Sequence, residues 1–392
     1  MSETLMNGSY DVIVLGVGAM GSATCSALAR RGHRVLGLER FDVPHVLGSS
    51  GGQTRLIRLA YYEHPDYVPL LRRAYAAWDE LAERSGVEVL HRTGALYLGP
   101  PGGHLIAGTL RSVAEHGVPC ERLDRDEAAR RFPQFRIPDA FGALFEPEAG
   151  FVLCERAISA FADEAMRAGA RIQARERVLE WSAGSEGVRV RTDRGSYEGG
   201  ELVITAGAWA PALMTDLGVE LRVTRQVIGW VWPDDPASFE LGAFPCWAVQ
   251  DDAPGFEGIY YGFPLLPAAG FAGERGIKLA HHFLGRTAEP ETLDRDPGPA
   301  DEADFRPALE RFLPGAAGAA TLAAKVCMYT ATPDEHFVVD RHPLHQRLTV
   351  GCGFTGHGFK FASVIGEALA DLAIERSSDL PIGFLGLSRF AN

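Results

Sequence analysis

Residues 11–39 carry the strongest chemical pattern in the chain. Three glycines are spaced as Gly16-x-Gly18-x-x-Gly21 and follow a short apolar run. In such a turn the first glycine permits the tight bend from strand to helix, the second leaves room for a pyrophosphate, and the third lets the helix pack on the strand. A second apolar run ends at Glu39, whose carboxylate can accept hydrogen bonds from ribose hydroxyls. The spacing predicts a dinucleotide site for FAD or NAD, and the charge of Glu39 disfavours NADP.

A second glycine-rich turn lies near the C-terminus. Residues 353–360 read GFTGHGFK and stand between a strand-like run at 347–352 and a helical pattern that continues to about residue 375. The N-terminus of that helix offers unpaired N–H groups to a negative charge, such as the charge that develops on a bound ring. Lys360 stands in the first turn, where the helix dipole disfavours a cation, so its placement indicates an anionic ligand. The alternative is an exposed lysine in a structural turn.

Two further groups of cationic side chains could line a pocket. In a strand over 276–283, Lys278 and His282 share one face, and a nearby aromatic run that includes Tyr261 could form a wall beside them. Arg55 and Arg58 follow a Gly/Ser-rich loop and would project from one side of a local helix. Guanidinium forks bind carboxylate or phosphate with two hydrogen bonds. The alternatives are a solvated sheet edge for the lysine and surface ion pairs for the arginines.

The elements that must position these residues follow from hydrophobic periodicity. Helical patterns and strand patterns alternate in the first half of the chain, and a run of strands follows in the second half. We expect helices at 66–84, 105–116 and 155–168, strands near 88–98, 202–204, 219–232, 258–264 and 276–283, and a surface loop at 284–304.

The predicted fold class is α/β, with a discontinuous Rossmann-type domain and a substrate domain built on a mainly antiparallel β-sheet. The pieces of the dinucleotide domain are separated in sequence, because the substrate domain occupies two insertions. We expect the first domain to comprise 1–85, 151–217 and 325–392, and the second 86–150 and 218–324.

Composition excludes several classes of partner. The 392 residues carry a formal net charge of -13, which argues against binding nucleic acid or an anionic membrane surface. The sequence contains no apolar stretch long enough to span a bilayer and no signal-peptide pattern at its start. The six cysteines are scattered, without metal-ligand spacing, so we expect reduced thiols, a cytoplasmic protein and no metal site.

Together these motifs resemble the monomeric sarcosine oxidase family, which includes N-methyltryptophan oxidase and the pipecolate oxidases. The resemblance covers nearly the whole chain and keeps the family's order. It rests on GVGAMG (16–21), TRLIRLAY (54–61), YVPL (67–70), TAGAW (205–209), GIYYGFP (258–264), KVCMYT (325–330), PDEHFVVD (333–340) and GHGFKFAS (356–363).

The resemblance implies FAD attached covalently through Cys327, and a substrate carboxylate held by Arg58 and Lys360. It implies that Lys278 promotes the reduction of oxygen. The resemblance assigns further catalytic positions to Arg55, His282, His357, Tyr261 and Tyr329, and further FAD contacts to Gly16, Gly18, Gly21, Glu39, Thr54, Val178, Gly207, Gly356 and Gly358.

The implied activity is oxidation of a secondary α-amino acid by O2, giving for an N-methyl substrate the demethylated amino acid, formaldehyde and hydrogen peroxide. The partners are then a small amino acid and O2, and the protein is expected to be a monomer. Two departures from the sarcosine-specific pattern leave the substrate open: the segments 245–258 and 262–277 are longer, and the 49–53 loop lacks paired histidines. Alternatives are an oxidase of a cyclic imino acid of the pipecolate or proline type, a flavin dehydrogenase with another electron acceptor, an NAD dehydrogenase, and a non-catalytic dinucleotide-binding protein.

Overall fold

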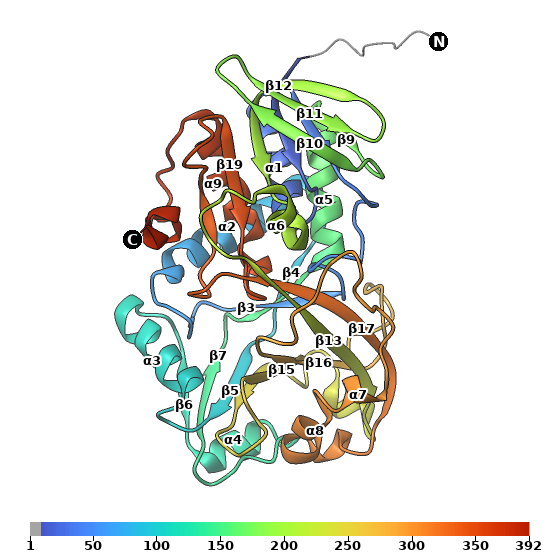
Figure 1. The fold of residues 1–392 in the computed structure, drawn as a ribbon. Helices are drawn as coiled ribbons and strands as arrows, with labels where there is room; N and C mark the ends of the chain where they lie inside the picture. Colours follow the sequence, from blue (N-terminus) through green and yellow to red (C-terminus); the bar gives the residue numbers. More distant parts are fainter. Residues whose placement is uncertain (1–8, 392) are drawn as a thin grey trace.

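Two eight-stranded β-sheets organise the chain, one in each half of the molecule (Figure 1). The computed structural model describes residues 9–391. The first sheet and its helices form the upper half in Figure 1, and the second sheet forms the lower half. A third sheet of three short strands lies between them, with the order β3 (Thr54–Ile57), β8 (Gly150–Leu153) and β4 (Leu90–Arg92).

The first sheet has the parallel core that the glycine motif predicts. Its parallel strands run in the order β9 (Arg171–Gln173), β2 (Val35–Leu38), β1 (Tyr10–Leu15), β12 (Ser196–Ile204) and β19 (Leu348–Cys352). An antiparallel strand, β18 (Val338–Arg341), closes one edge, and the hairpin β10 (Val178–Ala183) and β11 (Val188–Thr192) pairs with the start of β12. Strands from three distant parts of the sequence therefore meet side by side.

Burial on both faces explains the continuous apolar runs of these strands. Val12 and Val14 pack into the core beneath the long helices, while Ile13 and Leu15 pack against the opposite face. The long helices are α1 (Ala19–Arg30), α2 (Tyr67–Ser85), α5 (Cys154–Arg167) and α9 (Ala362–Ile374), and the opposite face carries the short helix α6 (Ala210–Leu213).

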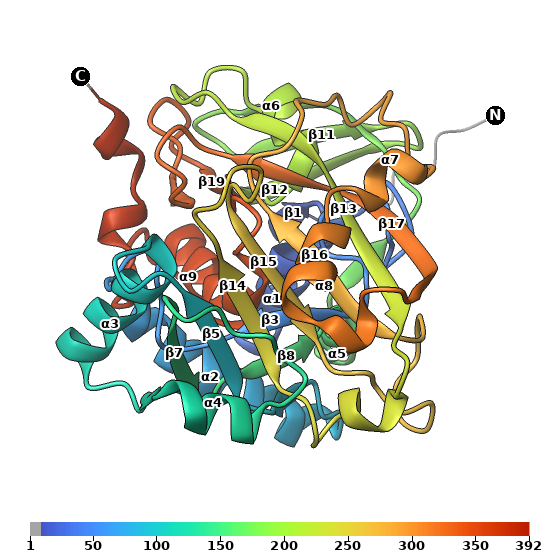
Figure 2. The ribbon, with the colours of Figure 1, turned by 90° about the horizontal axis from the view of Figure 1, so that it is seen from below.

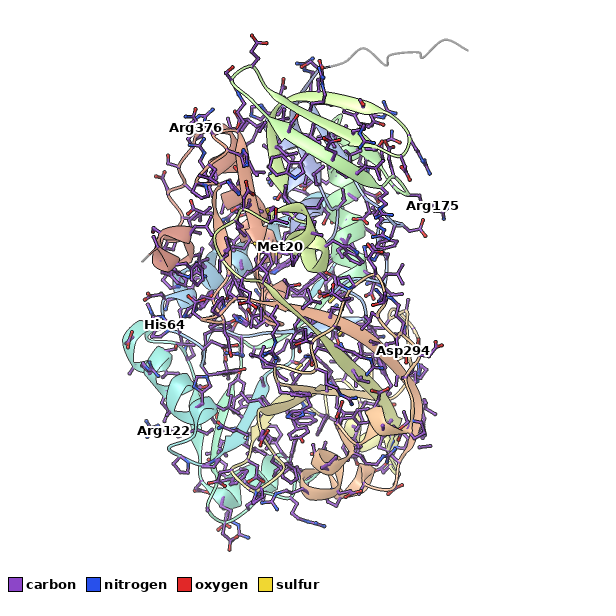
Figure 3. The ribbon with its side chains drawn as sticks, in the orientation of Figure 1. Met20, His64, Arg122, Arg175, Asp294 and Arg376 are labelled. Atoms are coloured by element: carbon purple, nitrogen blue, oxygen red, sulfur yellow. The ribbon has the colours of Figure 1, made fainter. Side chains whose placement is uncertain are left out.

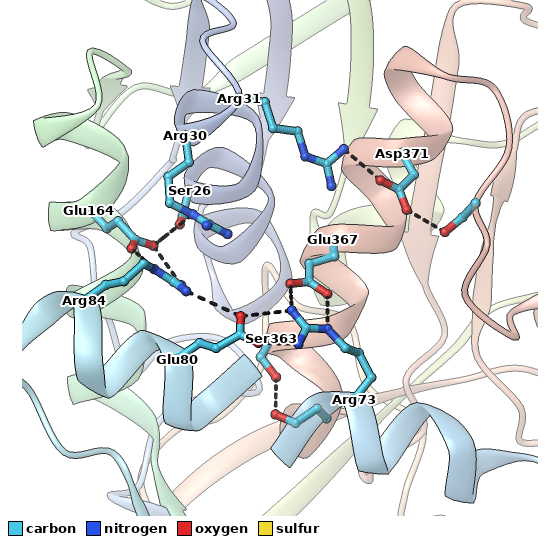
Figure 4. Close-up of polar contacts among 12 residues, drawn as sticks. Ser26, Arg30, Arg31, Arg73, Glu80, Arg84, Glu164, Ser363, Glu367 and Asp371 are labelled. Atoms are coloured by element: carbon cyan, nitrogen blue, oxygen red, sulfur yellow. Dashed lines mark hydrogen bonds and ion pairs between the residues drawn. The ribbon is translucent and has the colours of Figure 1, made fainter. Parts of the chain in front are cut away.

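Close helix packing requires small residues at the crossing of α1 and α9. A Cβ atom added to Gly366 would lie 2.5 Å from the Cβ of Ala23, so only glycine fits there. Around this crossing the helices are joined by polar contacts at their rims (Figure 4). Arg73 of α2 binds Glu367 of α9 at 2.8 Å, and Arg31, directly after α1, binds Asp371 at 2.7 Å. These partly exposed pairs orient the helices but add little stability compared with the buried apolar contacts.

The second sheet is mainly antiparallel, as predicted. The view from below shows it in front of the first sheet (Figure 2). Its order is β17 (Ala320–Ala331), β13 (Arg222–Trp232), β16 (Ile277–His282), β15 (Ile259–Phe263), β14 (Cys246–Gln250), β5 (Ala95–Gly99), β7 (Gly142–Glu146) and β6 (Glu121–Leu123). Only β14 and β5 pair in parallel among these strands. Helices α3 (His104–His116), α4 (Arg125–Arg131), α7 (Pro299–Glu302) and α8 (Arg306–Phe312) lie around it.

The predicted fold class is confirmed, and so are the helices expected near 66–84, 105–116 and 155–168. The domain boundaries stay a prediction, and one of them, at 324/325, falls inside strand β17. The helix proposed for Arg55 and Arg58 is wrong, because residues Thr54–Ile57 form strand β3, which pairs with β8. The predicted loop at 284–304 is irregular except for helix α7.

No helix among residues 9–391 combines the length and the apolar character needed to cross a membrane. None of the six cysteines forms a disulfide within residues 9–391.

Candidate active site

A cavity of about 390 Å³ opens at the carboxyl ends of the parallel strands. This is where ligands bind in open α/β sheets, because the strand ends and helix starts leave a crevice there. Figure 3 labels Met20, one of its lining residues, near the middle of the molecule. Seven of the predicted cofactor residues line this cavity: Gly16, Gly18, Glu39, Val178, Gly207, Gly356 and Gly358.

Each glycine of the first motif has the separate role that the sequence predicts. Gly16 has a φ of 88°, and a Cβ atom there would lie 2.7 Å from the carbonyl oxygen of Thr205. At Gly18 an added Cβ would meet no protein atom within 4 Å, so a side chain would enter the cavity. Gly21 does not line the cavity. A Cβ atom added there would lie 1.8 Å from the carbonyl oxygen of Gly16, so only glycine fits. The turn therefore reserves backbone-lined space for a ligand.

Polar groups in the larger cavity suit a dinucleotide. The carboxylate of Glu39 accepts hydrogen bonds from the backbone of Val17 at 2.8 Å and Phe41 at 2.9 Å. These bonds fix its orientation and leave lone pairs for ribose hydroxyls. On the far wall, the buried hydroxyl of Thr330 has no hydrogen-bond partner among the described residues. A buried polar group without a partner is costly, and a bound ligand would satisfy it.

A smaller pocket of about 50 Å³ adjoins the cavity and shares Arg55, Gly356 and Phe359 with it. Both cationic or imidazole side chains and apolar side chains line this pocket. The first group is Arg55, Arg58, His282, His357 and Lys360, and the second includes Leu56, Ala248 and Ile259. The pocket can therefore hold a small molecule with an anionic end and an apolar end.

Arg58 is the most constrained cation in the smaller pocket. Its side chain is 2% exposed and lies between the rings of Tyr61 and Tyr62, each centred 4.3 Å from the guanidinium carbon. Its Nη2 donates to both carboxylate oxygens of Glu63, at 2.8 and 2.6 Å, and its Nη1 donates to the carbonyl oxygen of Ala60 at 3.2 Å. Burial alone would raise the pKa of Glu63, but Arg58, His357 and Lys360 bring it to about 2. Sequence reasoning missed this carboxylate, although it stands only five residues after Arg58.

Lys360 lies beside Arg58 without a carboxylate of its own. Its ammonium donates to the carbonyl oxygen of His357 at 2.8 Å and lies 5.1 Å from the centre of the Tyr61 ring. Burial, followed by repulsion from Arg58, lowers its pKa to about 7. The alternative of an exposed lysine is wrong, because the residue is 5% exposed.

The two histidines of the pocket are neutral at ordinary pH. Burial lowers the pKa of His357 to about 3 and that of His282 to about 4. The Nε2 of His357 lies 3.1 Å from the carbonyl oxygen of Glu335, so Nε2 carries the proton and Nδ1 accepts from the Tyr61 hydroxyl at 2.5 Å. The Nδ1 of His282 lies 3.2 Å from the hydroxyl of Tyr329.

Tyr329 connects the two spaces. It lines the larger cavity, and its hydroxyl contacts both His282 and Tyr261, which line the smaller pocket. Burial raises the pKa of both tyrosines, so both hydroxyls stay protonated and can donate hydrogen bonds. The four predicted aromatic and imidazole residues His282, His357, Tyr261 and Tyr329 are thus brought together.

Lys278 lies behind the cavities and lines neither of them. Its ammonium donates to the carbonyl oxygens of Gly52 at 2.7 Å and Thr54 at 2.5 Å, and it lies 3.2 Å from the hydroxyl of Thr54. The solvated-edge alternative is wrong, since Lys278 is 2% exposed. Burial, followed by the charge of Arg55, lowers its pKa to about 7. Lys278 and Thr54 are therefore hydrogen-bonded to each other next to the loop that borders the larger cavity.

Arg55 binds the backbone of the same loop. Its guanidinium donates to the carbonyl oxygens of Ser49 at 2.8 Å, Gly51 at 2.7 Å and Thr54 at 2.9 Å. The surface-ion-pair alternative is wrong for Arg55, because its donors are used on backbone carbonyls at the cavity wall. It is wrong for Arg58 as well, whose ion pair with Glu63 is buried.

Cys327 lies in β17, opposite Gln226 of β13, and is 4% exposed. Its neighbours Met328 and Tyr329 line the larger cavity, whereas Cys327 itself does not. Burial raises the pKa of its thiol, and the charges of Arg55 and Lys278 oppose that shift. The cysteine is therefore adjacent to the cavity wall and close to two cations that favour a thiolate.

A second carboxylate that the sequence did not reveal supports the segment after Arg58. Glu146, at the end of β7, is fully buried and accepts from the backbone of Leu59 at 2.5 Å, the backbone of Ala60 at 3.2 Å and the hydroxyl of Tyr97 at 2.7 Å. Burial raises its pKa, and these hydrogen bonds oppose the shift. Its contacts fix the backbone directly after Arg58.

Comparison with known proteins matches this arrangement to a family. The family model described as "FAD dependent oxidoreductase" matches residues 11–372. The chain belongs to the FAD-dependent oxidoreductase family. Monomeric sarcosine oxidase of Streptomyces avermitilis is 41% identical over 98% of this chain and 99% of its own length. N-methyl-L-tryptophan oxidase of Salmonella dublin is 36% identical over 97% of this chain and 99% of its own length. The resemblance stated from the sequence is confirmed.

A solved structure of the same fold is NikD, an unusual amino acid oxidase essential for nikkomycin biosynthesis. Its open form superimposes with a TM-score of 0.84 at 27% identity and covers 97% of this chain and 98% of that one. The cofactor of this FAD-dependent oxidoreductase is FAD, and the NAD alternative is excluded. The residues of the larger cavity fit it, since Gly18 leaves room for the pyrophosphate and Glu39 presents a carboxylate to the ribose.

The Glu146→Gln variant tests how the segment around Arg58 is positioned. An amide cannot accept at both of its ends, so one of the three buried hydrogen bonds is lost, at a cost of about 1.5–3 kcal/mol for a bond to a charged group. We expect KM for the amino-acid substrate to rise by roughly tenfold, which is about 1.4 kcal/mol of binding, with a smaller change in kcat. Steady-state kinetics and thermal unfolding measure both effects. Glu148→Gln, an exposed neighbour, is the matched control, and equal kinetics for both variants would contradict the assignment.

Proposed function

We propose that this FAD-dependent enzyme oxidises a secondary α-amino acid, sarcosine or another N-methyl amino acid, with O2. The net reaction converts R–NH–CH3, O2 and water into R–NH2, formaldehyde and hydrogen peroxide. The observation that carries the proposal is the smaller pocket, whose cations adjoin the FAD cavity through the shared residues Arg55, Gly356 and Phe359. The names of the curated relatives, monomeric sarcosine oxidase and N-methyl-L-tryptophan oxidase, support the same substrate class.

The substrate carboxylate is proposed to bind Arg58 and Lys360. Glu63 binds only Nη2 of Arg58, so a carboxylate ligand can bind at the remaining donors of the guanidinium. Lys360 has only a carbonyl partner and gains a charged one when the substrate binds. Two fixed cations orient the small zwitterion, and orientation of the reacting carbon is a large part of catalysis.

The rest of the pocket selects the protonation state of the amine. His282 and His357 have pKa values of about 4 and about 3, which makes both poor proton acceptors at pH 7. We therefore propose that the amine gives its proton to solvent and binds in the neutral form, and that the neutral imidazoles only hydrogen-bond to it. Leu56, Ala248 and Ile259 provide the apolar wall against which alkyl groups pack.

FAD, when bound, supplies the two-electron acceptor and returns the electrons to O2. Lys278 is proposed to favour oxygen reduction, because a buried cation stabilises the negative charge that develops on oxygen. Its ammonium lies 2.7 Å from the carbonyl oxygen of Gly52, in a site without a carboxylate contact among the described residues. Cys327 is proposed to form the covalent link to FAD, supported by its position next to the cavity-lining residue Met328.

Two alternatives use the same pocket. A cyclic imino acid of the pipecolate or proline type carries the same carboxylate and secondary amine, and a flavin dehydrogenase would pass electrons to an acceptor other than O2. Lys278 favours the oxidase over the dehydrogenase. We further propose a cytoplasmic monomer. The free state of all six cysteines supports a reducing compartment, and the printed name of the sarcosine oxidase relatives supports the monomer.

A substrate screen tests the proposed function. Sarcosine, N-methyl amino acids with larger side chains, proline and pipecolate are each mixed with the purified enzyme under air, and peroxide is measured with a coupled peroxidase. We expect turnover only with secondary α-amino acids and one peroxide per substrate oxidised. Substrate-dependent bleaching of FAD without peroxide would identify a dehydrogenase, and the absence of bleaching with every secondary amino acid would refute the proposal.

Mass spectrometry of the denatured chain tests the covalent link. We expect the intact mass to exceed that of the polypeptide by the mass of FAD, and the Cys327→Ser variant to show the bare chain mass. Cys352→Ser, a buried cysteine in β19, is the matched control and should keep the added mass. A bare mass for the unmodified enzyme would disprove the link while leaving bound FAD intact.

The affinity for a carboxylate should depend on pH through Lys360. With a pKa of about 7, the ammonium is charged below that pH and loses its charge above it. We expect acetate, used as a simple carboxylate ligand, to bind progressively more weakly from pH 6 to pH 8.5, and the Lys360→Met variant to bind weakly with a flatter profile. Titration followed by FAD absorbance measures this. Lys325→Met, which removes a half-exposed lysine paired with Glu274, is the control, and an unchanged profile in Lys360→Met would contradict the role.

A further inference from the structure

Three potential metal ligands meet on the side of the first sheet, away from both cavities. Asp216 follows helix α6, and His342 and His345 stand in the turn between β18 and β19. The three ligand atoms lie within 4.8 Å of one another. The Nε2 of His342 is 3.3 Å from one carboxylate oxygen of Asp216, and the Nε2 of His345 is 2.8 Å from the other. Neither the activity nor FAD binding uses any of these residues.

We propose that Asp216, His342 and His345 form a site for a divalent transition-metal ion of the zinc type. Imidazole nitrogen and carboxylate oxygen are ligands that such ions prefer. In a tetrahedral site with bonds of about 2.05 Å the ligand atoms lie about 3.3 Å apart. The observed separations of 3.3 and 2.8 Å are close to that spacing, so small side-chain shifts complete the geometry.

The second observation is an unsatisfied nitrogen that faces the cluster. The Nε2 of His342 is buried without a hydrogen-bond partner among the described residues, and its side chain is 0% exposed. A buried nitrogen in that state is costly, and a metal ion would satisfy it. The side chains of Asp216 and His345 are 43% and 28% exposed, so the fourth coordination position opens toward water.

Binding requires both imidazoles to change. The Nε2 of His345 donates to Asp216 at 2.8 Å, so its proton must move to Nδ1 before Nε2 can bind a metal ion. The Nδ1 of His342 accepts from the backbone of Leu344 at 3.2 Å, so without metal the proton stands on Nε2. Metal binding at Nε2 moves that proton to Nδ1 and ends the contact. Leu344 is 68% exposed, and its amide can then bond to water instead. The site would tie the turn after α6, whose Ala212 and Leu213 line the FAD cavity, to the β18–β19 turn.

Calorimetric titration of the FAD-loaded enzyme with zinc sulfate, after treatment with a chelator, tests the proposal. We expect one ion per chain, and a dissociation constant that is at least about tenfold weaker in Asp216→Asn and in His345→Ala. Cobalt(II) as a second probe should give visible bands of tetrahedral coordination in the unmodified protein only. His104→Ala, an exposed histidine on α3, is the matched control.

Three outcomes would overturn the site: no saturable binding of zinc to the unmodified enzyme, equal affinity in the Asp216 and His345 variants, or the same loss in the control. The first needs no variant, so it decides the question even where a substitution prevents folding. Metal binding should also raise the thermal unfolding temperature of the unmodified enzyme and leave that of the Asp216→Asn variant unchanged. Peroxide formation is not the readout, so failure of the site leaves the proposed amine oxidation untouched.

Discussion

The structure depends on the burial of four cationic side chains around two adjoining cavities. Arg55, Arg58, Lys278 and Lys360 are each within reach of the FAD cavity or the pocket beside it, and burial of unpaired charge is among the most costly events in folding. Each cation is compensated differently: Arg55 and Lys278 by backbone carbonyls, Arg58 by Glu63, and Lys360 by a single carbonyl. This unequal compensation leaves Lys360 and the remaining guanidinium donors of Arg58 ready for an anionic ligand.

These carbonyl oxygens can compensate the buried positive charges because two carboxylates fix the backbone segments to which the carbonyls belong. Glu155, in the first turn of α5, accepts from the backbone of Gly52 at 2.7 Å and so fixes the loop whose carbonyls surround Lys278. Glu146 does the same for the segment after Arg58. Carboxylates therefore accept hydrogen bonds from backbone N–H groups, and cations donate hydrogen bonds to backbone carbonyls of the same loops. The binding surface is thus built from oriented peptide groups as much as from side chains.

Much of the cofactor site could be predicted from the sequence because its causes are local. The roles of Gly16, Gly18 and Glu39 follow from a single strand–turn–helix–strand unit, and the structure confirms their place at the cavity. Contacts between distant segments could not be read in the same way. Arg55 was placed on a helix because pairing of β3 with β8, far along the chain, gives no local signal. Glu63 and Glu146 were missed because an acid has no distinctive spacing, and the partners of Glu146 come from other elements.

Lysine is rare in this chain: it accounts for three of the 38 basic residues, and arginine for the others. Two of the three, Lys278 and Lys360, are buried at the site, while Lys325 is 36% exposed and paired with Glu274. Arginine stays charged in any setting, whereas a buried lysine can release its proton near neutral pH. Among the side chains of residues 9–391, amine-directed coupling chemistry would therefore reach Lys325, on β17, far more readily than the two buried amines. Among the lysines, attachment of the enzyme to a solid support by that route would use one anchoring position and leave Lys278 and Lys360 unmodified.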